Sequence, residues 1–124
     1  RANIRGKRII IIDDSIVRGT TMRKIINLLR EAGAKEVHIR ICSPVVKHPC
    51  HLGIDTQSYS QLIGAYKDEN QICKSIGADS LRYLSVEHLA QSCKQCNLNF
   101  CQGCFTGEYP YAVDEYEADK LKLE

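Results

Sequence analysis

The sequence contains no long hydrophobic run. No stretch of about 18 apolar residues is present, so we expect no membrane span. Residues 1–7 contain no apolar stretch that resembles a secretory signal. Neither sign of charge dominates, with 17 Lys and Arg against 15 Asp and Glu, and no internal repeat or low-complexity tract is present. These absences exclude disordered, collagen-like and coiled-coil chains, and 124 residues with 44% apolar content can bury a globular core.

Cysteine, in contrast, is abundant, with seven in 124 residues. An odd number of cysteines without a secretory signal argues against a disulfide-linked scaffold. We therefore expect a reducing, cytoplasmic environment in which some of the thiols are metal ligands. Cys42 and Cys73 lie apart from the others, and we expect both to be small buried hydrophobic residues.

The small net charge of +2 conceals an uneven distribution. Residues 1–50 carry 11 basic and 4 acidic side chains, a balance of +7, whereas residues 51–124 carry 6 basic and 11 acidic side chains, a balance of −5. A basic half of this kind favours an anion-binding surface, and a solvated basic face is the alternative.

The first 42 residues predict a strand, a loop, a helix and a second strand. Isoleucines occupy positions 9–12, and because this run does not alternate with polar residues, we expect a central parallel strand buried on both faces. Apolar side chains then recur at helical spacing, at Met22, Ile25, Ile26 and Leu29. Gly33 is expected to end this helix, and residues 37–42 alternate as a second strand. This order predicts a right-handed βαβ unit and an α/β fold.

The remainder of the chain has weaker patterns. Residues 43–59 are rich in loop-forming residue types. We then expect three short elements, a helix over 70–76, a strand over 80–84 and a helix over 86–91. Regular patterning is lost from Cys93 onward. We therefore divide the chain into an α/β part, residues 1–92, and a cysteine-rich irregular segment with an acidic tail, residues 93–124.

The segment that follows the first strand carries the strongest functional signal. Asp13 and Asp14 end the strand, and a loop with Gly19 and hydroxyl side chains leads into the helix. Ligands of parallel sheets bind at the carboxyl ends of the strands, and the free N–H groups of a helix N-terminus favour a phosphate. The two carboxylates repel a phosphate and instead suit sugar hydroxyls or a divalent cation. The segment predicts a phosphorylated sugar bound with Mg²⁺; the alternative is an ordinary strand end before a helix cap.

The run IIIIDDSIVRGTT, residues 9–21, resembles the phosphoribosyl-pyrophosphate (PRPP) signature of type I phosphoribosyltransferases. Within that superfamily it closely resembles the amidophosphoribosyltransferase family. Further segments that resemble this family follow in order at 29–34, 43–44, 48–50, 53–56, 76–81, 84–86 and 101–110. The resemblance implies the C-terminal portion of the parallel-sheet phosphoribosyltransferase fold, followed by the cysteine-rich segment.

The resemblance also implies roles for nine consecutive residues. The two aspartates would contact the ribose hydroxyls and Mg²⁺, and the backbone of residues 15–21 would wrap the 5′-phosphate. The implied PRPP-binding residues are Asp13, Asp14, Ser15, Ile16, Val17, Arg18, Gly19, Thr20 and Thr21. The implied enzyme is a pentosyl glycosyltransferase of purine biosynthesis, which uses ammonia from glutamine to displace pyrophosphate from PRPP. The loop offers no nucleophile, and we assign no catalytic residue to this chain.

Four cysteines, at positions 93, 96, 101 and 104, form two Cys-x-x-Cys pairs. Such pairs can hold zinc, although structural zinc sites usually separate their pairs by more residues. The resemblance instead implies a [4Fe-4S] cluster of the Bacillus type, with Cys50, Cys101 and Cys104 as ligands. The family's fourth ligand lies upstream of this chain, so we also keep open that Cys93 or Cys96 replaces it, or that no cluster is bound.

The resemblance further implies that the chain is a C-terminal fragment of a longer enzyme. The family's N-terminal glutaminase domain, its upstream strands and its pyrophosphate-binding loop have no counterpart here. We expect the fragment to be inactive alone. Its implied partners are PRPP and the remainder of an enzyme that forms homo-oligomers, and we expect neither a nucleic acid nor a membrane as a partner.

Two other interpretations stay open. One is a different PRPP-binding protein, such as a base-salvage transferase or a PRPP-sensing regulator. Such proteins resemble the strand and the acidic pair but rarely residues 16–18 or the cysteine-bearing tail. The other is a zinc module that binds nucleic acid through Arg23, Lys24 and Arg30, although no aromatic residues interleave with these cations.

Overall fold

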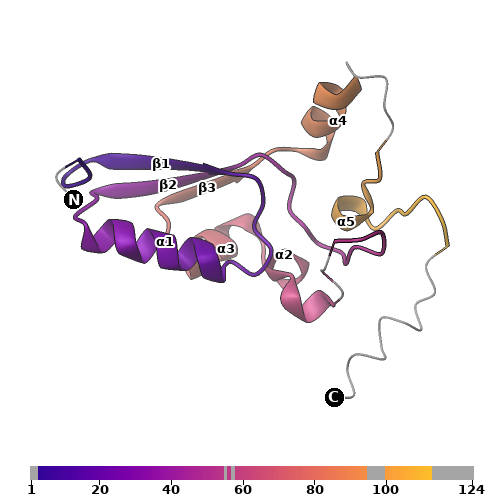
Figure 1. Cartoon of the computed structure of the whole chain (residues 1–124), viewed down its shortest axis with the longest axis horizontal. Helices are drawn as coiled ribbons and strands as arrows, with labels where there is room; N and C mark the ends of the chain where they lie inside the picture. The colour runs from indigo at the N-terminus through magenta and orange to yellow at the C-terminus, as the bar shows by residue number, and fades with distance from the viewer. Residues whose placement is uncertain (1–2, 55, 57, 95–99, 113–124) are drawn as a thin grey trace.

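The computed structural model describes residues 3–54, 56, 58–94 and 100–112 (Figure 1). Three parallel strands form one sheet in the order β1-β2-β3, and their bounds are Arg8–Asp13, Glu36–Ile41 and Ser80–Tyr83. Helix α1 (Thr20–Glu31) connects β1 to β2, and helix α3 (Glu69–Ile76) precedes β3. The βαβ unit and the α/β class expected from the sequence are confirmed.

The hydrophobic core lies between the sheet and helices α1 and α3, which cover the same face of the sheet (Figure 1). Every second residue of β2 is buried, and Val37, Ile39 and Ile41 point to this face. They join one cluster with Ile26 of α1 and Ile72 of α3. The core therefore fixes both helices against the central strand and sets the position of the loop that precedes α1.

Strand β1 differs from its predicted environment. It is the edge strand of the sheet, and β2 is central. Ile11 packs against the core, whereas Ile10 and Ile12 on the other face are 64% and 70% exposed. The prediction of a strand buried on both faces was wrong for the described part of the chain, because both helices lie on one face and these two side chains remain open to solvent.

Replacing the two exposed isoleucines with threonine is expected to raise solubility. Ile10→Thr/Ile12→Thr keeps β-branched side chains in the strand but removes adjacent apolar groups from an exposed edge, where chains associate readily. We expect the concentration of the 124-residue chain that stays in solution after centrifugation to rise about twofold or more, with little change in thermal midpoint. The matched control, Ile11→Thr, alters a side chain packed on the core and should lower the midpoint instead. An unchanged solubility limit in the double variant would contradict the prediction.

Three helical turns were not expected from the sequence: η1 (Tyr59–Gln61), α2 (Ile63–Tyr66) and α5 (Gly103–Thr106). Each is too short for its apolar residues to show helical periodicity. Helix α4 (Val86–Lys94) runs across the expected division at residues 92 and 93, and that division stays a prediction. In the described part of the chain, no helix has both the length and the apolar character needed to cross a bilayer.

The two isolated cysteines occupy different environments. Cys42 is exposed just after β2, so its expected burial was wrong, since the strand ends at the residue before it. Cys73 is half-buried in α3, and its thiol donates a hydrogen bond to the Ala78 carbonyl at 3.3 Å. Burial raises the pKa of the Cys73 thiol, which suits the expected structural role.

Candidate functional site

The acidic pair lies at the carboxyl edge of the sheet. Asp13 is the last residue of β1, and its carbonyl accepts a hydrogen bond from the Cys42 N–H at 2.9 Å, beside the end of β2. The Asp13 carboxylate accepts from the Asp14 N–H at 3.0 Å, and the Asp14 carboxylate accepts from the Ser15 N–H at 2.7 Å. Each carboxylate keeps further acceptor capacity, because an ionised carboxylate offers about four lone-pair positions.

The segment that follows, which we call the glycine loop (residues 15–21), is held in place from beneath. Ile16 is only 3% exposed and belongs to the core cluster, so it anchors the loop to the fold. The Val17 carbonyl accepts a hydrogen bond from the Ile63 N–H at 2.9 Å, which ties the loop to the start of α2. Gly19 caps α1 with a φ of 76°, a left-handed conformation that favours glycine.

The glycine loop also presents a row of backbone donors. The N–H groups of residues 16–22 donate to no acceptor in the parts of the chain that the structure describes; the first backbone bond into α1 runs from the Arg23 N–H to the Gly19 carbonyl. The first turn of α1 contains no acidic residue, and no side chain caps it. Free N–H groups at the positive end of a helix form a site for an anion such as phosphate.

The acidic pair and the glycine loop together supply two kinds of binding group. Hard carboxylate oxygens suit Mg²⁺, which is commonly held by one or two carboxylates together with substrate phosphates and water. Among the residues described, no three His, Cys, Asp or Glu side chains are arranged to hold a metal ion.

A second cluster brings Cys50 close to Cys101 and Cys104, although they are far apart in sequence. The N–H groups of Lys47 and His48 donate to the Cys104 carbonyl at 2.9 and 3.0 Å. The Tyr109 hydroxyl donates to the Pro49 carbonyl at 2.6 Å. A Cβ on Gly103 would lie 2.3 Å from the Tyr109 ring, so only glycine lets α5 approach this ring so closely. These contacts join the segment that bears Cys50 to the one that bears the Cys-x-x-Cys pair.

The electrostatics of this three-cysteine cluster show how close the thiols are. Burial raises the pKa of Cys104, and the neighbouring Cys50 and Cys101 raise it further. The Gly103 N–H donates to the Cys101 sulfur at 3.4 Å. Cys93 lies on α4 outside this cluster's contacts, and Cys96 falls outside the described residues.

Comparison with known proteins gives a consistent result. The sequence-family model of the phosphoribosyl transferase domain matches residues 1–60. The amidophosphoribosyltransferase of Synechococcus elongatus is 52% identical to the chain over 120 residues, which are 96% of the chain. That of Bacillus subtilis is 48% identical over 117 residues, which are 91% of the chain. Over nearly its whole length, the chain is homologous to a segment of the amidophosphoribosyltransferases.

A solved member of the amidophosphoribosyltransferase family has the same fold. The glutamine PRPP amidotransferase of B. subtilis, complexed with ADP and GMP, superposes with a TM-score of 0.82 at 44% identity over 92% of the chain. The chain covers 26% of that structure and 24% and 25% of the two curated relatives, and it corresponds to a C-terminal part of them. This similarity favours the transferase interpretation over the salvage-type protein and the zinc module.

Sequence reasoning located the acidic pair and the glycine loop but missed the residues that support them. Ile63 and Ile76 lie directly under Gly19, since a Cβ there would be 3.3 Å from a methyl group of each. Neither residue carries a local signal for this role. A hydrophobic residue beneath a ligand-binding loop has the same sequence pattern as any other core residue.

Proposed function

We propose that the chain forms the PRPP-binding part of an enzyme that converts PRPP and glutamine to 5-phosphoribosylamine, pyrophosphate and glutamate. This is the first step of purine biosynthesis. Because the chain spans about a quarter of its relatives, the whole reaction is assigned to the longer protein and only the sugar-phosphate site to these residues. The homo-oligomer expected from the family resemblance stays a prediction.

The observation that carries this proposal is the adjacency of two complementary groups of ligands. The unbonded N–H groups of residues 16–22 suit the 5′-phosphate, and the carboxylates of Asp13 and Asp14 suit the ribose hydroxyls and Mg²⁺. A sugar phosphate bound together with a cation satisfies the N–H groups and the carboxylates at the same time. A simple phosphate-binding loop would not need the carboxylates.

The chemistry proposed at this site requires positioning rather than a protein nucleophile. The nitrogen of ammonia forms a bond to the anomeric carbon of PRPP as the bond from that carbon to the pyrophosphate oxygen breaks. Positive charge develops on the sugar and negative charge on the leaving group. Nearby carboxylates stabilise the positive charge on the sugar, and Mg²⁺, when bound, screens the negative charge on the pyrophosphate. The rigid loop keeps the sugar still while this occurs, because Ile16 and Val17 fix it to the core and α2.

Titration of the 124-residue chain with PRPP tests the assignment. With Mg²⁺ present, we expect saturable binding by calorimetry and ¹⁵N chemical-shift changes centred on residues 14–22. Removing Mg²⁺ should weaken binding about tenfold, because a cation that bridges carboxylate and phosphate contributes on the order of 1.4 kcal/mol or more. Ribose 5-phosphate is the control ligand and should depend little on Mg²⁺. PRPP binding without shifts in the glycine loop would overturn the assignment.

We also propose that the three-cysteine cluster supplies thiolate ligands to a [4Fe-4S] cluster. The proposal is supported by the proximity of Cys50 and Cys101 to the half-buried Cys104 and by the N–H donor to the Cys101 sulfur. In a [4Fe-4S] cluster the thiolates bind separate iron atoms, so the three cysteines would each hold one iron.

Anaerobic reconstitution distinguishes an iron–sulfur cluster from zinc. With iron and sulfide supplied, we expect a brown protein with broad visible absorption, which the Cys50→Ser and Cys104→Ser variants each lack. Cys73→Ser, which alters a cysteine outside the cluster, is the control and should retain the colour. A colourless protein that binds one equivalent of zinc through the same cysteines would refute the iron–sulfur proposal.

A further inference from the structure

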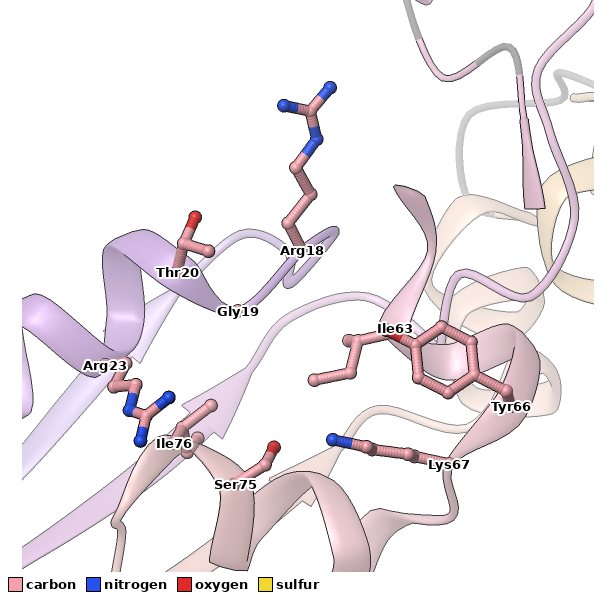
Figure 2. Close-up of a pocket in the computed structure, with 9 residues that line it drawn as sticks. All are labelled: Arg18, Gly19, Thr20, Arg23, Ile63, Tyr66, Lys67, Ser75 and Ile76. Atoms are coloured by element: carbon pink, nitrogen blue, oxygen red, sulfur yellow. The ribbon is translucent and has the colours of Figure 1, made fainter. Parts of the chain in front are cut away.

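A cavity of about 140 Å³ opens between α1, α2 and α3, on the side of the glycine loop that faces those helices. Ile63, Ile76 and Gly19 form its apolar lining. Figure 2 shows the side chains of Arg23 and Lys67 reaching toward the space in front of Ser75, from α1 and from the turn after α2. Three elements that are distant in sequence thus contribute polar groups to one cavity.

The cavity is lined by positive charge without a matching negative charge. Arg18, Arg23 and Lys67 all line it, and no aspartate or glutamate does. Within the described residues, none of these three cations forms an ion pair. Arg30 and Arg82, in contrast, form ion pairs with Asp79 and Glu69.

We propose that this cavity binds a small phosphate-bearing anion, held by the Arg23 guanidinium and the Lys67 ammonium. The space is many times the minimum that a single water needs, and so has room for one phosphate group. Charge-assisted hydrogen bonds to phosphate oxygens are the interactions these two side chains form best. The exposed Tyr66 ring at the rim offers a flat surface to whatever group the phosphate carries.

This phosphate pocket borders the PRPP site, with which it shares Arg18, Gly19 and Thr20 of the glycine loop. Its proposed ligand groups are those of Arg23 and Lys67, so it does not rest on the proposed function. Figure 2 shows the side chains of Arg18 and Thr20 pointing away from Ser75 and Lys67. The C-terminal end of α3 lies at the pocket, where the N–H of Gly77 bonds the carbonyls of Cys73 and Lys74 and the N–H of Ala78 also bonds the Cys73 carbonyl. The ligand is recognised by side chains here, whereas the glycine loop recognises its ligand through backbone N–H groups.

A site-resolved titration with inorganic phosphate at constant ionic strength tests the pocket. We expect ¹⁵N shifts at residues 66, 67, 75 and 76 that saturate together and are distinct from any shifts in residues 16–22. Lys67→Gln and Arg23→Gln should each weaken the phosphate binding that residues 66, 67, 75 and 76 report by about fivefold or more. Lys24→Gln removes the same charge from an exposed position on α1 that does not line the pocket, and should change affinity less than twofold.

A second ligand identifies the source of the phosphate. Phenyl phosphate is compared with inorganic phosphate. If it binds more tightly, and if Tyr66→Ala abolishes the difference, the ligand is a phosphate monoester that carries an aromatic group. If the two bind equally tightly, the ligand is free phosphate. The spectrum of each variant reports whether the fold is intact. Shifts confined to residues 16–22, or unchanged affinity in both Lys67→Gln and Arg23→Gln, would overturn the proposal.

Discussion

Asp13→Asn/Asp14→Asn is expected to weaken Mg²⁺-dependent PRPP binding by about 100-fold or more. Each substitution removes a charged acceptor, and a hydrogen bond to a charged group contributes about 1.5–3 kcal/mol. Asparagine keeps the shape of aspartate and a carbonyl oxygen, so the bonds from the Asp14 and Ser15 N–H groups can persist. The loop should therefore stay folded while its affinity for the cation and the ribose hydroxyls falls.

The measurement is calorimetric titration with PRPP, with and without Mg²⁺. Glu31→Gln/Glu87→Gln removes the same two charges from exposed positions outside the site and serves as the control. The double aspartate variant should also lose most of its dependence on Mg²⁺, whereas ribose 5-phosphate should lose less affinity than PRPP, because it gives up the hydroxyl contacts but keeps those of its phosphate with the glycine loop. Equal PRPP affinity in the variant and the parent would remove the assigned role of the acidic pair.

Gly64→Ala is expected to destabilise the fold by about 3 kcal/mol, near the upper end for overpacked core sites. Gly64 is buried in α2, where an added Cβ would lie 2.4 Å from a Val45 methyl and 2.6 Å from the Val46 carbonyl oxygen. The methyl can rotate away, but the carbonyl belongs to the backbone and can move only with its segment. The helix would have to shift, although its φ and ψ accept alanine.

The thermal midpoint and the urea midpoint of the chain measure this effect. Ala65→Ser adds an atom at the neighbouring exposed position of the same helix and should leave both midpoints nearly unchanged. Because the Ile63 N–H in α2 holds the Val17 carbonyl, Gly64→Ala should also weaken PRPP binding at temperatures where the protein is still folded. Unchanged midpoints in Gly64→Ala would show that the segment around Val46 yields more easily than the contacts indicate.

The sequence alone determined the elements whose signals are local. The βαβ unit followed from the isoleucine run, the helical spacing of the residues from 22 to 29 and the alternation after Gly33. Gly33 and Gly77 both adopt a positive φ just past a helix, as expected for glycine at these positions. The acidic pair and glycine loop were also recognisable, since their ligand groups follow one another along the chain and need no distant partner to be identified.

The tertiary structure decided which faces and which distant residues meet. A run of isoleucines indicates an apolar strand but not which of its faces is covered. Because both helices lie on one face of the sheet, Ile10 and Ile12 on the other face are exposed. The approach of Cys50 to Cys101 and Cys104, and of Lys67 to Arg23, depends on contacts between segments many residues apart. Such contacts form only when burial of the shared core brings the segments together, so periodicity and local motifs do not predict them.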